Sequence, residues 1–498
     1  MNLRGYLSTI RLPGLLFLAL ATLIIARNTW LFGPPIYEAG DAAANSILVE
    51  QARHLSLLVG NYSRVGFNHP GPFFMYVQAA GDVVFYRVLG IVNSSYAGQV
   101  LGLILLSAFL VAASIHLLVA QRRTLDYALA CVAFAAYLLL SQSFGNPDML
   151  KPSWLGSSWM PAVYCAPFLL FMCAVAVCAR GEAHALPWLA FSGAALVHGH
   201  VSFVMVVCLM TCLSLVAGCV SDGGFRWLHD RRRLLVSAAI LGIFILPIAL
   251  HTLIDFPGEI GLYLHYARNH SSAPHQGGVK RFLLHFLGGD KRRAFNPIAL
   301  TIIAIYAWAI ASRRLRKPAA ASLLAVLAAT LATAIYAKTG IDNLAFTYTA
   351  WFYSVTGLFV FISLSQGLAA YCQMRPAYLA MASLLVSMAA AVCLVNIRFE
   401  SRYRGDPALP VLLAKLKTDF PPGLHALRFR HDDWPVATGL VANGMREGIS
   451  VCIDDAQWQF MFTRRLICSN SKQAPVDHLD LNANGGTSYA LTPAPSKP

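Results

Sequence analysis

Charged residues are scarce in this chain. Only 12% of its 498 residues are Asp, Glu, Lys or Arg, whereas 57% are hydrophobic. A soluble globule cannot bury so much apolar surface, so the composition indicates a protein whose solvent is mostly lipid. Acidic residues are the scarcer sign, with 23 Asp and Glu against 38 Lys and Arg. In a membrane protein this excess predicts basic cytoplasmic loops and gives no reason to expect nucleic-acid binding.

Zinc-binding cysteine motifs are missing as well. The 11 cysteines are scattered along the chain, with no CxxC pair and no Cys/His spacing typical of zinc sites, which argues against a structural zinc. Several lie inside apolar runs, where a thiol behaves as a small hydrophobic group. Cys452 and Cys468 lie near the C-terminus. Outside the cytoplasm these two can pair as a disulfide, and the sequence leaves the pairing open.

Apolar runs are abundant, and eleven of them are candidates for helices that cross a bilayer, which takes about 20 apolar residues. Basic residues, from Arg4 and Arg11 to Arg375, fall in alternate loops. The positive-inside rule therefore predicts that the N-terminus lies in the cytoplasm. The predicted fold class is a polytopic α-helical membrane protein with a small C-terminal α/β domain. The runs are 12–31, 98–120, 125–142, 161–179, 186–199, 201–219, 234–253, 297–312, 319–336, 347–366 and 376–396.

Beyond the last run the character of the sequence changes. We expect a transmembrane domain over residues 1–396, a small periplasmic α/β domain over 397–472, and a flexible tail over 473–498. In the second region LHALRFR alternates like a strand, DDWPVATGLVANG fits a capped helix, and ISVCID fits another strand. The residues after 472 show no core pattern and are expected to be loose.

The first outer loop, residues 32–97, is too long for a simple turn. It carries Glu38 and Asp41 shortly after the first apolar run. Apolar residues recur at helical spacing from Asp41 onward, which predicts an amphipathic helix lying at the membrane interface. A second helix is expected to begin at Pro72 as its first residue. Between them, GNYSRVGFNHPG is a turn-rich crossing that contains His69.

Two motifs of this loop resemble a known family. Asp41 stands in YEAGDAAAN, and His69, Pro70, Gly71 and Pro72 form an HPGP turn. This arrangement is similar to the GT-C superfamily of membrane glycosyltransferases, in particular the branch with protein O-mannosyltransferases and the lipid A aminoarabinose transferase. The resemblance covers the first 100 residues by motif and the rest by hydropathy. It implies transfer of a hexose, or of a pentose such as arabinose, from a polyprenyl-phosphate donor to a periplasmic glycan, lipid or protein acceptor.

Each candidate site residue has more than one interpretation. Asp41 suits a base that takes the proton of an acceptor hydroxyl, or an acceptor-binding group; it also suits an N-cap of the helix that follows. Glu38 is the alternative carboxylate for the same chemistry. His69 can order its turn, or it can donate a hydrogen bond to the donor phosphate or sugar. His200, with His198 in VHGHVSF, can face a hydrated cavity at the outer end of a helix.

Cations for the departing phosphate are expected in the outer loop 254–296. Arg268, Lys280 and Arg281 are the candidates, because such charges stabilise a leaving phosphate. Trp154 and Trp159 fit either a sugar site or an interfacial aromatic belt. No cofactor is required beyond the polyprenyl-phosphate sugar, which is the donor substrate, and a divalent metal is possible but not implied by the residues.

Two other classes of function compete with this prediction. A lipid-linked sugar flippase or other transporter is disfavoured, because no inverted repeat and no matched pair of Gly/Pro-interrupted spans is visible in the sequence. The second competing class is an envelope scaffold, in which the C-terminal region binds a partner and the first loop is inert. The sugar, the acceptor and the stereochemistry stay open.

Overall fold

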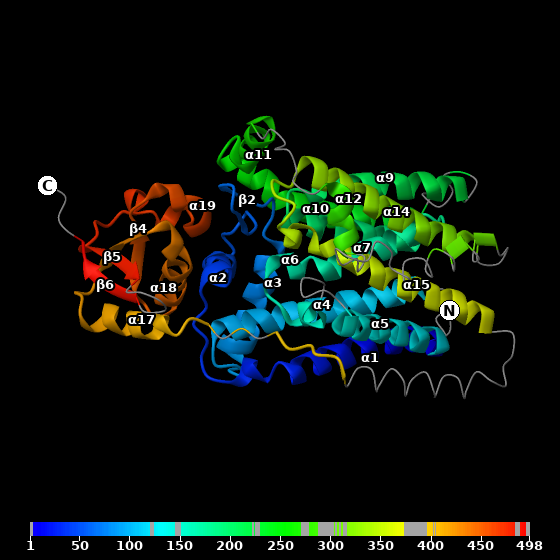
Figure 1. Cartoon of the computed structure of the whole chain (residues 1–498), viewed down its shortest axis with the longest axis horizontal. Helices are drawn as coiled ribbons and strands as arrows, with labels where there is room; N and C mark the ends of the chain where they lie inside the picture. The colour runs from blue at the N-terminus through cyan, green and yellow to red at the C-terminus, as the bar shows by residue number, and fades with distance from the viewer. Residues whose placement is uncertain are drawn as a thin grey trace. The chain divides into compact units, whose positions relative to one another are not determined.

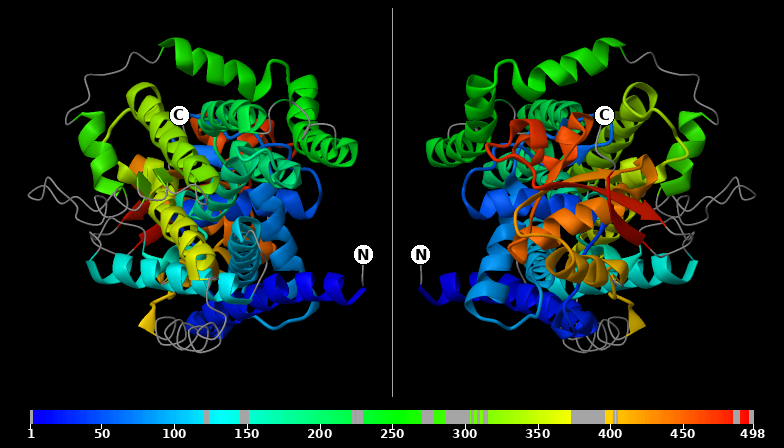
Figure 2. Two further views of the ribbon diagram at one scale, coloured as in Figure 1. Left: turned by 90° about the vertical axis from the view of Figure 1, so that its right-hand side faces the viewer. Right: turned by 90° about the vertical axis from the view of Figure 1, so that its left-hand side faces the viewer.

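The computed structural model describes two compact units (Figures 1 and 2). Unit 1 comprises Met1–Asn28, Ile104–Leu246 and Asn269–Ser401, and unit 2 comprises Thr29–Leu103, Pro247–Arg268 and Arg402–Pro498. The described residues are 3–119, 124–144, 151–221, 224, 230–269, 278–286, 303, 306–307, 310–311, 316–372, 396–401, 403, 405–483 and 489–494.

Unit 1 is helical, and α7 lies at its centre. Helix α7 (Cys165–Cys178) reads CAPFLLFMCAVAVC and is buried along its whole length, because a helix that is apolar all round has no face that prefers water. Helices α8, α9, α14 and α15 pack against it. The helices of unit 1 are α1 Leu3–Arg27, α4 Ser95–Leu118, α5 Thr124–Phe144, η3 Pro152–Gly156, α6 Met160–Val163, α7, η4 Ala183–Ala185, α8 Leu186–Gly199, α9 Phe203–Ser221, α10 Arg231–Ile254, α12 Val279–Phe286, α14 Arg316–Thr339, η6 Thr347–Ser354 and α15 Val355–Cys372, with the first turns of α4 and the last turns of α10 in unit 2.

Six helices among the described residues are long and apolar enough to cross a membrane. This makes the chain a multi-pass membrane protein, as predicted, but the number is below the eleven expected. Two further segments, Leu12–Arg27 and Asp126–Gln142, are apolar helices of shorter length. The expected break at HGH is confirmed, because α8 ends at Gly199 and α9 begins at Phe203. The expected spans 297–312 and 376–396 lie largely outside the described residues.

Unit 2 joins the first loop to the C-terminal region. Its elements are η1 Thr29–Phe32, α2 Gly40–Arg53, β1 Tyr62–Ser63, β2 Phe67–Asn68, α3 Phe73–Gly81, the π-helix η2 Asp82–Val88, α11 Gly258–Asn269, α17 Ala408–Thr418, β3 Leu424–Phe429, η7 His431–Asp433, α18 Trp434–Arg446, β4 Ser450–Ile453, η8 Ala456–Trp458, α19 Gln459–Phe462, η9 Arg464–Leu466, η10 Cys468–Asn470, β5 Asp477–Ala483 and β6 Tyr489–Pro493. The division therefore differs from the expected one, which assigned residues 32–97 to the transmembrane domain.

A four-stranded sheet confirms the small α/β domain. Its strand order is β4-β3-β5-β6, with β3 parallel to β4 and to β5, and with β6 antiparallel to β5. The expectation of a loose tail over 473–498 is wrong for β5 and β6. In β5 the alternate residues Leu479 and Leu481 are buried, but the Asp, His and Asn between them made the segment resemble a loop.

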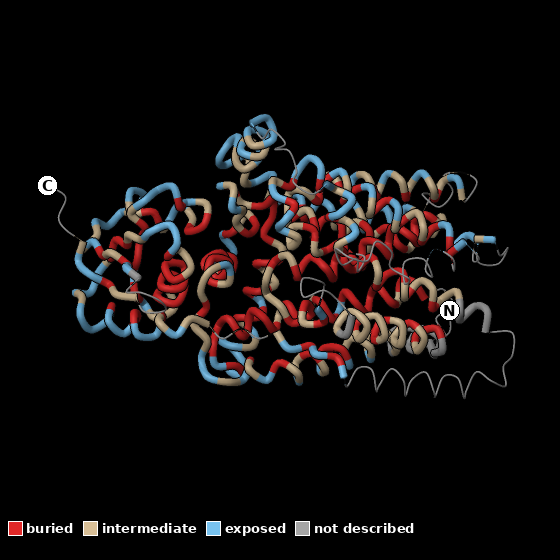
Figure 3. The backbone as a smooth tube through the Cα atoms, viewed as in Figure 1, coloured by how far each residue is buried: buried red, intermediate tan, exposed pale blue. Residues whose placement is uncertain are grey.

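The core of unit 2 corrects the expected position of the first amphipathic helix. Helix α2 does form, but its apolar face does not lie at an interface: Ala43, Ala44 and Ile47 belong to one buried cluster with Leu409 of α17 and Leu440 of α18. Figure 3 shows α2 and α18 as largely buried helices. The first loop is therefore part of the folded C-terminal domain. The second helix, α3, begins one residue later than expected, with Pro72 as its N-cap.

One disulfide lies in this domain. Cys452 of β4 is bonded to Cys468 of η10, which resolves the pairing that the sequence left open. A backbone bridge between Ile453 and Ile467 runs beside it.

Candidate functional site

The extended segment before α2 is held by α18. The Asn443 side chain donates to the Glu38 carbonyl oxygen at 3.1 Å, and the Thr438 hydroxyl donates to the Gly40 carbonyl oxygen at 3.3 Å. Gly439 permits this close approach, because a Cβ added there would lie 2.9 Å from the Glu38 carbonyl oxygen. Helix α18 therefore fixes the backbone that leads to Asp41.

Glu38 itself is completely buried and faces Arg446. The Glu38 Oε1 atom lies 2.6 Å from Nη1 of Arg446, whose side chain is 15% exposed. A buried carboxylate needs such a partner, since an unpaired charge in the interior is strongly destabilising. The pair ties the first loop to the last turn of α18. This geometry favours a structural role for Glu38 over contact with a substrate.

A tyrosine supports the next residue of the segment. The Tyr403 hydroxyl accepts a hydrogen bond from the Ala39 N–H at 2.8 Å and donates to the Ala39 carbonyl oxygen at 3.1 Å. Burial raises the pKa of Tyr403 to about 12, and the nearby charges of Glu38, Asp406 and Asp41 act in the same direction, against the bond from Ala39. The hydroxyl therefore stays protonated near neutral pH and keeps both bonds.

Asp41 lies in the first turn of α2 with its side chain exposed. The preceding Gly40 has φ +58, a left-handed conformation that glycine adopts with little cost. The N-cap residue is Ala39, without a side-chain cap, so the capping role considered for Asp41 is not the one observed. Its carboxylate accepts a hydrogen bond from the Tyr62 hydroxyl of β1 instead. This bond joins the first turn of α2 to the strand β1.

The turn-rich crossing forms the β1–β2 hairpin. Tyr62 pairs with Asn68, and the backbone of His69 bonds to Gly60 and to Asn61, each at 2.8 Å. The His69 side chain is 3% exposed, and its ring lies 6.0 Å from that of Phe67. These contacts support the role of His69 in ordering the turn. A contact with the donor stays a prediction.

A carboxylate that the sequence analysis did not consider touches the same hairpin. Glu259, in the first turn of α11, accepts the Asn68 N–H at 2.8 Å, and the Tyr263 hydroxyl donates to the Asn68 carbonyl oxygen at 2.5 Å. Burial raises the pKa of Glu259 to about 7, against the opposing effect of the bond from Asn68. Burial and the charge of Glu259 raise the pKa of Tyr263. The sequence did contain a signal for this residue, because Glu259 follows Phe256, Pro257 and Gly258 at the end of an apolar run.

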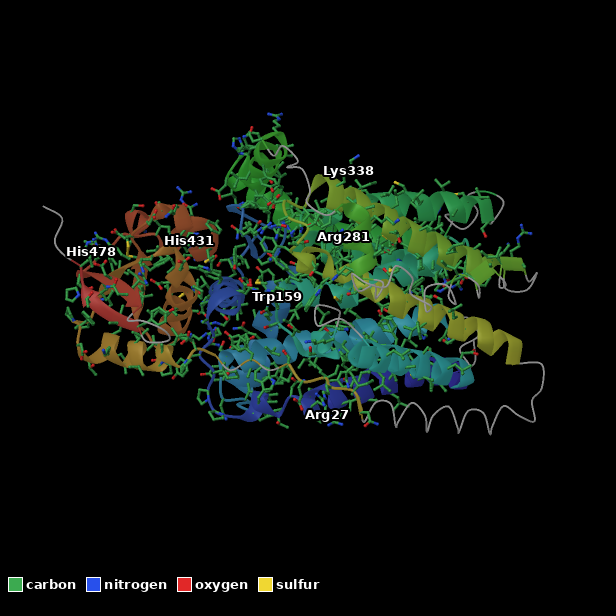
Figure 4. All side chains as sticks on the ribbon, viewed as in Figure 1. Arg27, Trp159, Arg281, Lys338, His431 and His478 are labelled. Carbon is green, nitrogen blue, oxygen red and sulfur yellow. A yellow bond between two sulfur atoms is a disulfide. The ribbon has the colours of Figure 1, made fainter. Side chains whose placement is uncertain are left out.

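The candidate cations fall in different units. Arg268 lies exposed in the last turn of α11 in unit 2. Lys280 and Arg281, the latter labelled in Figure 4, lie exposed near the start of α12 in unit 1. Arg64, which the sequence analysis passed over, is exposed in the turn of the β1–β2 hairpin. Unit 2 thus contains exposed cations on the hairpin and on the helix that contacts it.

The two histidines of VHGHVSF belong to unit 1. His200 follows the last turn of α8, and its Nδ1 atom lies 2.8 Å from the Ser202 hydroxyl. His198 is buried, with Nε2 2.7 Å from the Phe244 carbonyl oxygen. Both rings therefore have partners that fix the break between α8 and α9. The structure does not bring His200 and Asp41 into one unit.

The two tryptophans of KPSWLGSSWMP also lie in unit 1. Trp154 is 2% exposed. The ring of Trp159, labelled in Figure 4, lies 5.4 Å from the Tyr348 ring and 5.1 Å from the Trp351 ring. Trp159 is therefore one member of an aromatic group that packs within this unit.

In unit 2 the exposed Asp41 carboxylate thus lies beside a hairpin that Glu259 and the buried His69 support. Such a site can accept a proton from a hydroxyl and can hydrogen-bond a polyol. Among the described residues, no group of three His, Cys, Asp or Glu side chains is placed to hold a metal ion.

Comparisons with known proteins bear on the fold. No family model and no curated protein matches the chain. The structure is similar to that of ArnT from Cupriavidus metallidurans bound to undecaprenyl phosphate, with a TM-score of 0.54 and 13% identity over 94% of this chain and 89% of that one.

A weaker likeness is to the Archaeoglobus fulgidus oligosaccharyltransferase in the apo form, with a TM-score of 0.41 and 13% identity over 87% of this chain and 64% of that one. Another is to the AglB oligosaccharyltransferase of the same organism in complex with an inhibitory peptide and a dolichol-phosphate. Its TM-score is 0.35, with 12% identity over 86% of this chain and 63% of that one. At such TM-scores neither adds to the inference about this chain. This chain therefore has the fold seen in ArnT, which confirms the predicted fold class of a multi-pass helical membrane protein with a small C-terminal α/β domain.

Proposed function

We propose that this chain is a membrane glycosyltransferase that moves a sugar from a polyprenyl-phosphate carrier to an acceptor hydroxyl. The observation that carries the proposal is the exposed carboxylate of Asp41, fixed at the start of α2 by Gly40, Tyr62 and the backbone contacts of α18. Its setting in the fold seen in ArnT supports the choice of donor, since that protein was crystallised with undecaprenyl phosphate.

The chemistry needs little covalent participation from the protein. In a single displacement the acceptor oxygen attacks the anomeric carbon, the bond from that carbon to the phosphate oxygen breaks, and the polyprenyl phosphate leaves with the electron pair. Asp41 takes the proton of the acceptor hydroxyl. The hydrogen bond from the Tyr62 hydroxyl orients the carboxylate for this step.

Cations stabilise the phosphate as it leaves. In unit 2 we assign this role to Arg64 and Arg268, which are exposed on the hairpin and on α11. Lys280 and Arg281 in unit 1 are exposed as well and remain candidates from the sequence. Guanidinium groups suit this task because their planar fork can bind two phosphate oxygens at once.

The side of the membrane on which the proposed site lies is inferred from the composition of unit 2 and from the charge pattern of the loops. The first loop, residues 247–268 and the C-terminal domain fold as one compact unit, which requires them to lie on the same side of the bilayer. The positive-inside rule assigns all three to the non-cytoplasmic side. The disulfide of Cys452 and Cys468 supports this side, because disulfides persist in oxidising compartments. We therefore place the site at the periplasmic face of a bacterial inner membrane.

The test is an Asp41→Asn variant of the full chain, reconstituted in lipid and assayed with undecaprenyl-phosphate-linked hexoses and pentoses. Loss of a general base lowers the rate by about two to four powers of ten. Asp419→Asn is the matched control, since Asp419 is an exposed carboxylate at the end of α17 in the same unit. Sugar transfer that Asp41→Asn leaves intact refutes the proposal. Unchanged product with lost carrier translocation supports a transporter instead.

A further inference from the structure

Helix α2 contains a buried amide whose oxygen is unpaired. Asn45 lies one turn after Asp41 and is 4% exposed, and its Oδ1 atom has no hydrogen-bond partner among the described residues. A buried carbonyl oxygen without a donor is costly, because the water that solvates it in the unfolded chain is lost and nothing replaces it. Asn is also a weaker helix former than Ala or Leu. Folding alone therefore does not favour an amide at this position.

The polar side chains around it are paired. Ser46, the next residue of α2, is 2% exposed, and its hydroxyl donates to Oε1 of Gln99 at 3.1 Å. The Gln99 amide in turn donates to the Ser95 hydroxyl at 3.3 Å. In the described part of unit 2 the other buried oxygens without a hydrogen-bond partner belong to carboxylates that face a basic side chain, namely Glu38 with Arg446, Asp82 with Arg87 and Asp477 with His425. The amide of Asn45 is therefore an exception in this unit.

Asn45 lies on the same face of α2 as Asp41. Residues four apart are neighbours on a helix surface, with Cβ atoms about 5–6 Å apart. The stripe that these two residues begin continues through Leu48 and Ala52, which are 0% and 1% exposed, whereas Asp41 is exposed. Asn45 therefore marks the point where this stripe passes from the surface into the core. A ligand at the Asp41 carboxylate needs to extend by about one helical turn to reach the amide.

The unpaired atom determines which ligand fits. An amide oxygen accepts hydrogen bonds and has no proton to donate, so it binds a hydroxyl and not the acceptor oxygens of a phosphate. In the proposed reaction, the acceptor oxygen at Asp41 attacks the anomeric carbon of the donor sugar. The hydroxyls nearest to that oxygen are the one on the adjacent carbon of the donor and, on a saccharide acceptor, the one beside the reacting hydroxyl. Both offer the proton that Oδ1 lacks.

We propose that Asn45 determines sugar specificity, with its Oδ1 atom accepting a hydrogen bond from a sugar hydroxyl beside the reaction centre. This role rests on the proposed function, because it requires Asp41 to lie at the oxygen that attacks the donor. The substrate then supplies the partner that the fold does not, and binding offsets the cost of burying the amide. A sugar without this hydroxyl leaves the amide unpaired and binds less well.

Stability is measured first, because it separates a residue that serves the fold from one that serves the substrate. Asn45→Leu keeps the branched shape of the side chain, and Asn45→Ala cannot overpack the site. Both remove the unpaired amide and introduce a better helix former, so native-state hydrogen exchange of α2 should be unchanged or slower. Ser46→Ala is the matched control, since it leaves Oε1 of Gln99 without its donor and should make exchange faster. Faster exchange in both Asn45 variants assigns the amide to the fold and overturns the specificity role.

Binding to the donor is measured next. The full chain in lipid nanodiscs is titrated by calorimetry with a short-chain polyprenyl phosphate that carries a hexose or a pentose, with its 2-deoxy analogue, and with the bare polyprenyl phosphate. Both Asn45 variants should bind the sugar-linked probe about tenfold more weakly than the wild type, as expected for one hydrogen bond. They should bind the 2-deoxy and bare probes with wild-type affinity. Ser46→Ala should match the wild type with all three.

Sugar transfer to a saccharide acceptor distinguishes the two sources of the hydroxyl. Unchanged donor affinity in the Asn45 variants, together with a KM for the acceptor that rises about tenfold, assigns the hydroxyl to the acceptor and supports the specificity role. Donor affinity and acceptor KM that both stay at the wild-type value, in a chain that transfers sugar, overturn the role of Asn45 alone and leave its amide to an internal water. A wild-type chain that neither binds the sugar-linked probe nor transfers sugar refutes the proposed function itself.

Discussion

The ion pair between Glu38 and Arg446 offers a direct way to separate a structural carboxylate from a catalytic one. Glu38 is 0% exposed and Arg446 is 15% exposed, with 2.6 Å between Oε1 and Nη1. Replacing Arg446 by Met leaves the Glu38 charge buried without its partner, whereas Glu38→Leu leaves a guanidinium that can still reach some water. We therefore expect Arg446→Met to be the more damaging of the two single changes.

The magnitude follows from the burial. Removing one partner of a buried pair costs about 3–5 kcal/mol, which corresponds to roughly two to four powers of ten in an opening equilibrium. Replacing both partners by apolar residues removes the buried charge altogether and is often neutral. The double variant Glu38→Leu/Arg446→Met is expected to recover most of the loss seen in Arg446→Met.

Native-state hydrogen exchange of peptides from α18 and from residues 36–42 measures this free energy locally. Protection of α18 should fall in Arg446→Met and return in the double variant, together with sugar transfer. Additive losses, or single changes within about 0.5 kcal/mol of the wild type, would contradict the buried-pair assignment. A double variant that regains protection but has no transferase activity would return Glu38 to the catalytic candidates.

Two other predictions concern the same unit. The pKa of Glu259 is raised to about 7, so the folded state favours the neutral acid, and stability that is present below the ordinary pKa of Glu is lost as the pH rises through 7. Protection factors of α11 should therefore fall between about pH 5 and 8, and Glu259→Gln should remove this dependence. A wild-type protection profile that does not change with pH would refute the prediction. Gly40→Ala meets Trp434 only at van der Waals distance but forces a left-handed Ala, so exchange protection of the first turn of α2 should fall by about 1–2 kcal/mol; an unchanged value would show that Gly40 is not held left-handed.

Local patterns predicted the parts of the chain that local physics controls. Apolar length predicted the membrane helices, and the break at HGH was found where the two histidines interrupt an apolar run. Alternation predicted β3 and β4, and spacing predicted α2 and α18. The strands β5 and β6 were missed, because their polar residues resemble loop sequence and their register comes from pairing with β3.

The candidate site also combines residues that local patterns could identify with residues that only long-range contacts bring together. Asp41 could be selected as an ionisable residue close to a membrane span, a rare and costly placement. The sequence could not distinguish Glu38 from Asp41. The difference between them is that Arg446 of α18 faces the buried Glu38, whereas Asp41 is exposed. Glu259 and Tyr263, nearly two hundred residues further along, could not be connected to the hairpin at Asn68 by any spacing rule.

The sequence by itself determined that this protein spans a membrane many times, that a carboxylate follows the first span, and that an α/β region ends the chain, because composition and periodicity act over short stretches. Only the tertiary structure decided that the first loop and the C-terminal domain share one core, that Glu38 is a buried partner of Arg446, and that Asp41 is exposed beside the β1–β2 hairpin. Burial and long-range pairing depend on residues about 400 positions away, and no local pattern records which segments will meet.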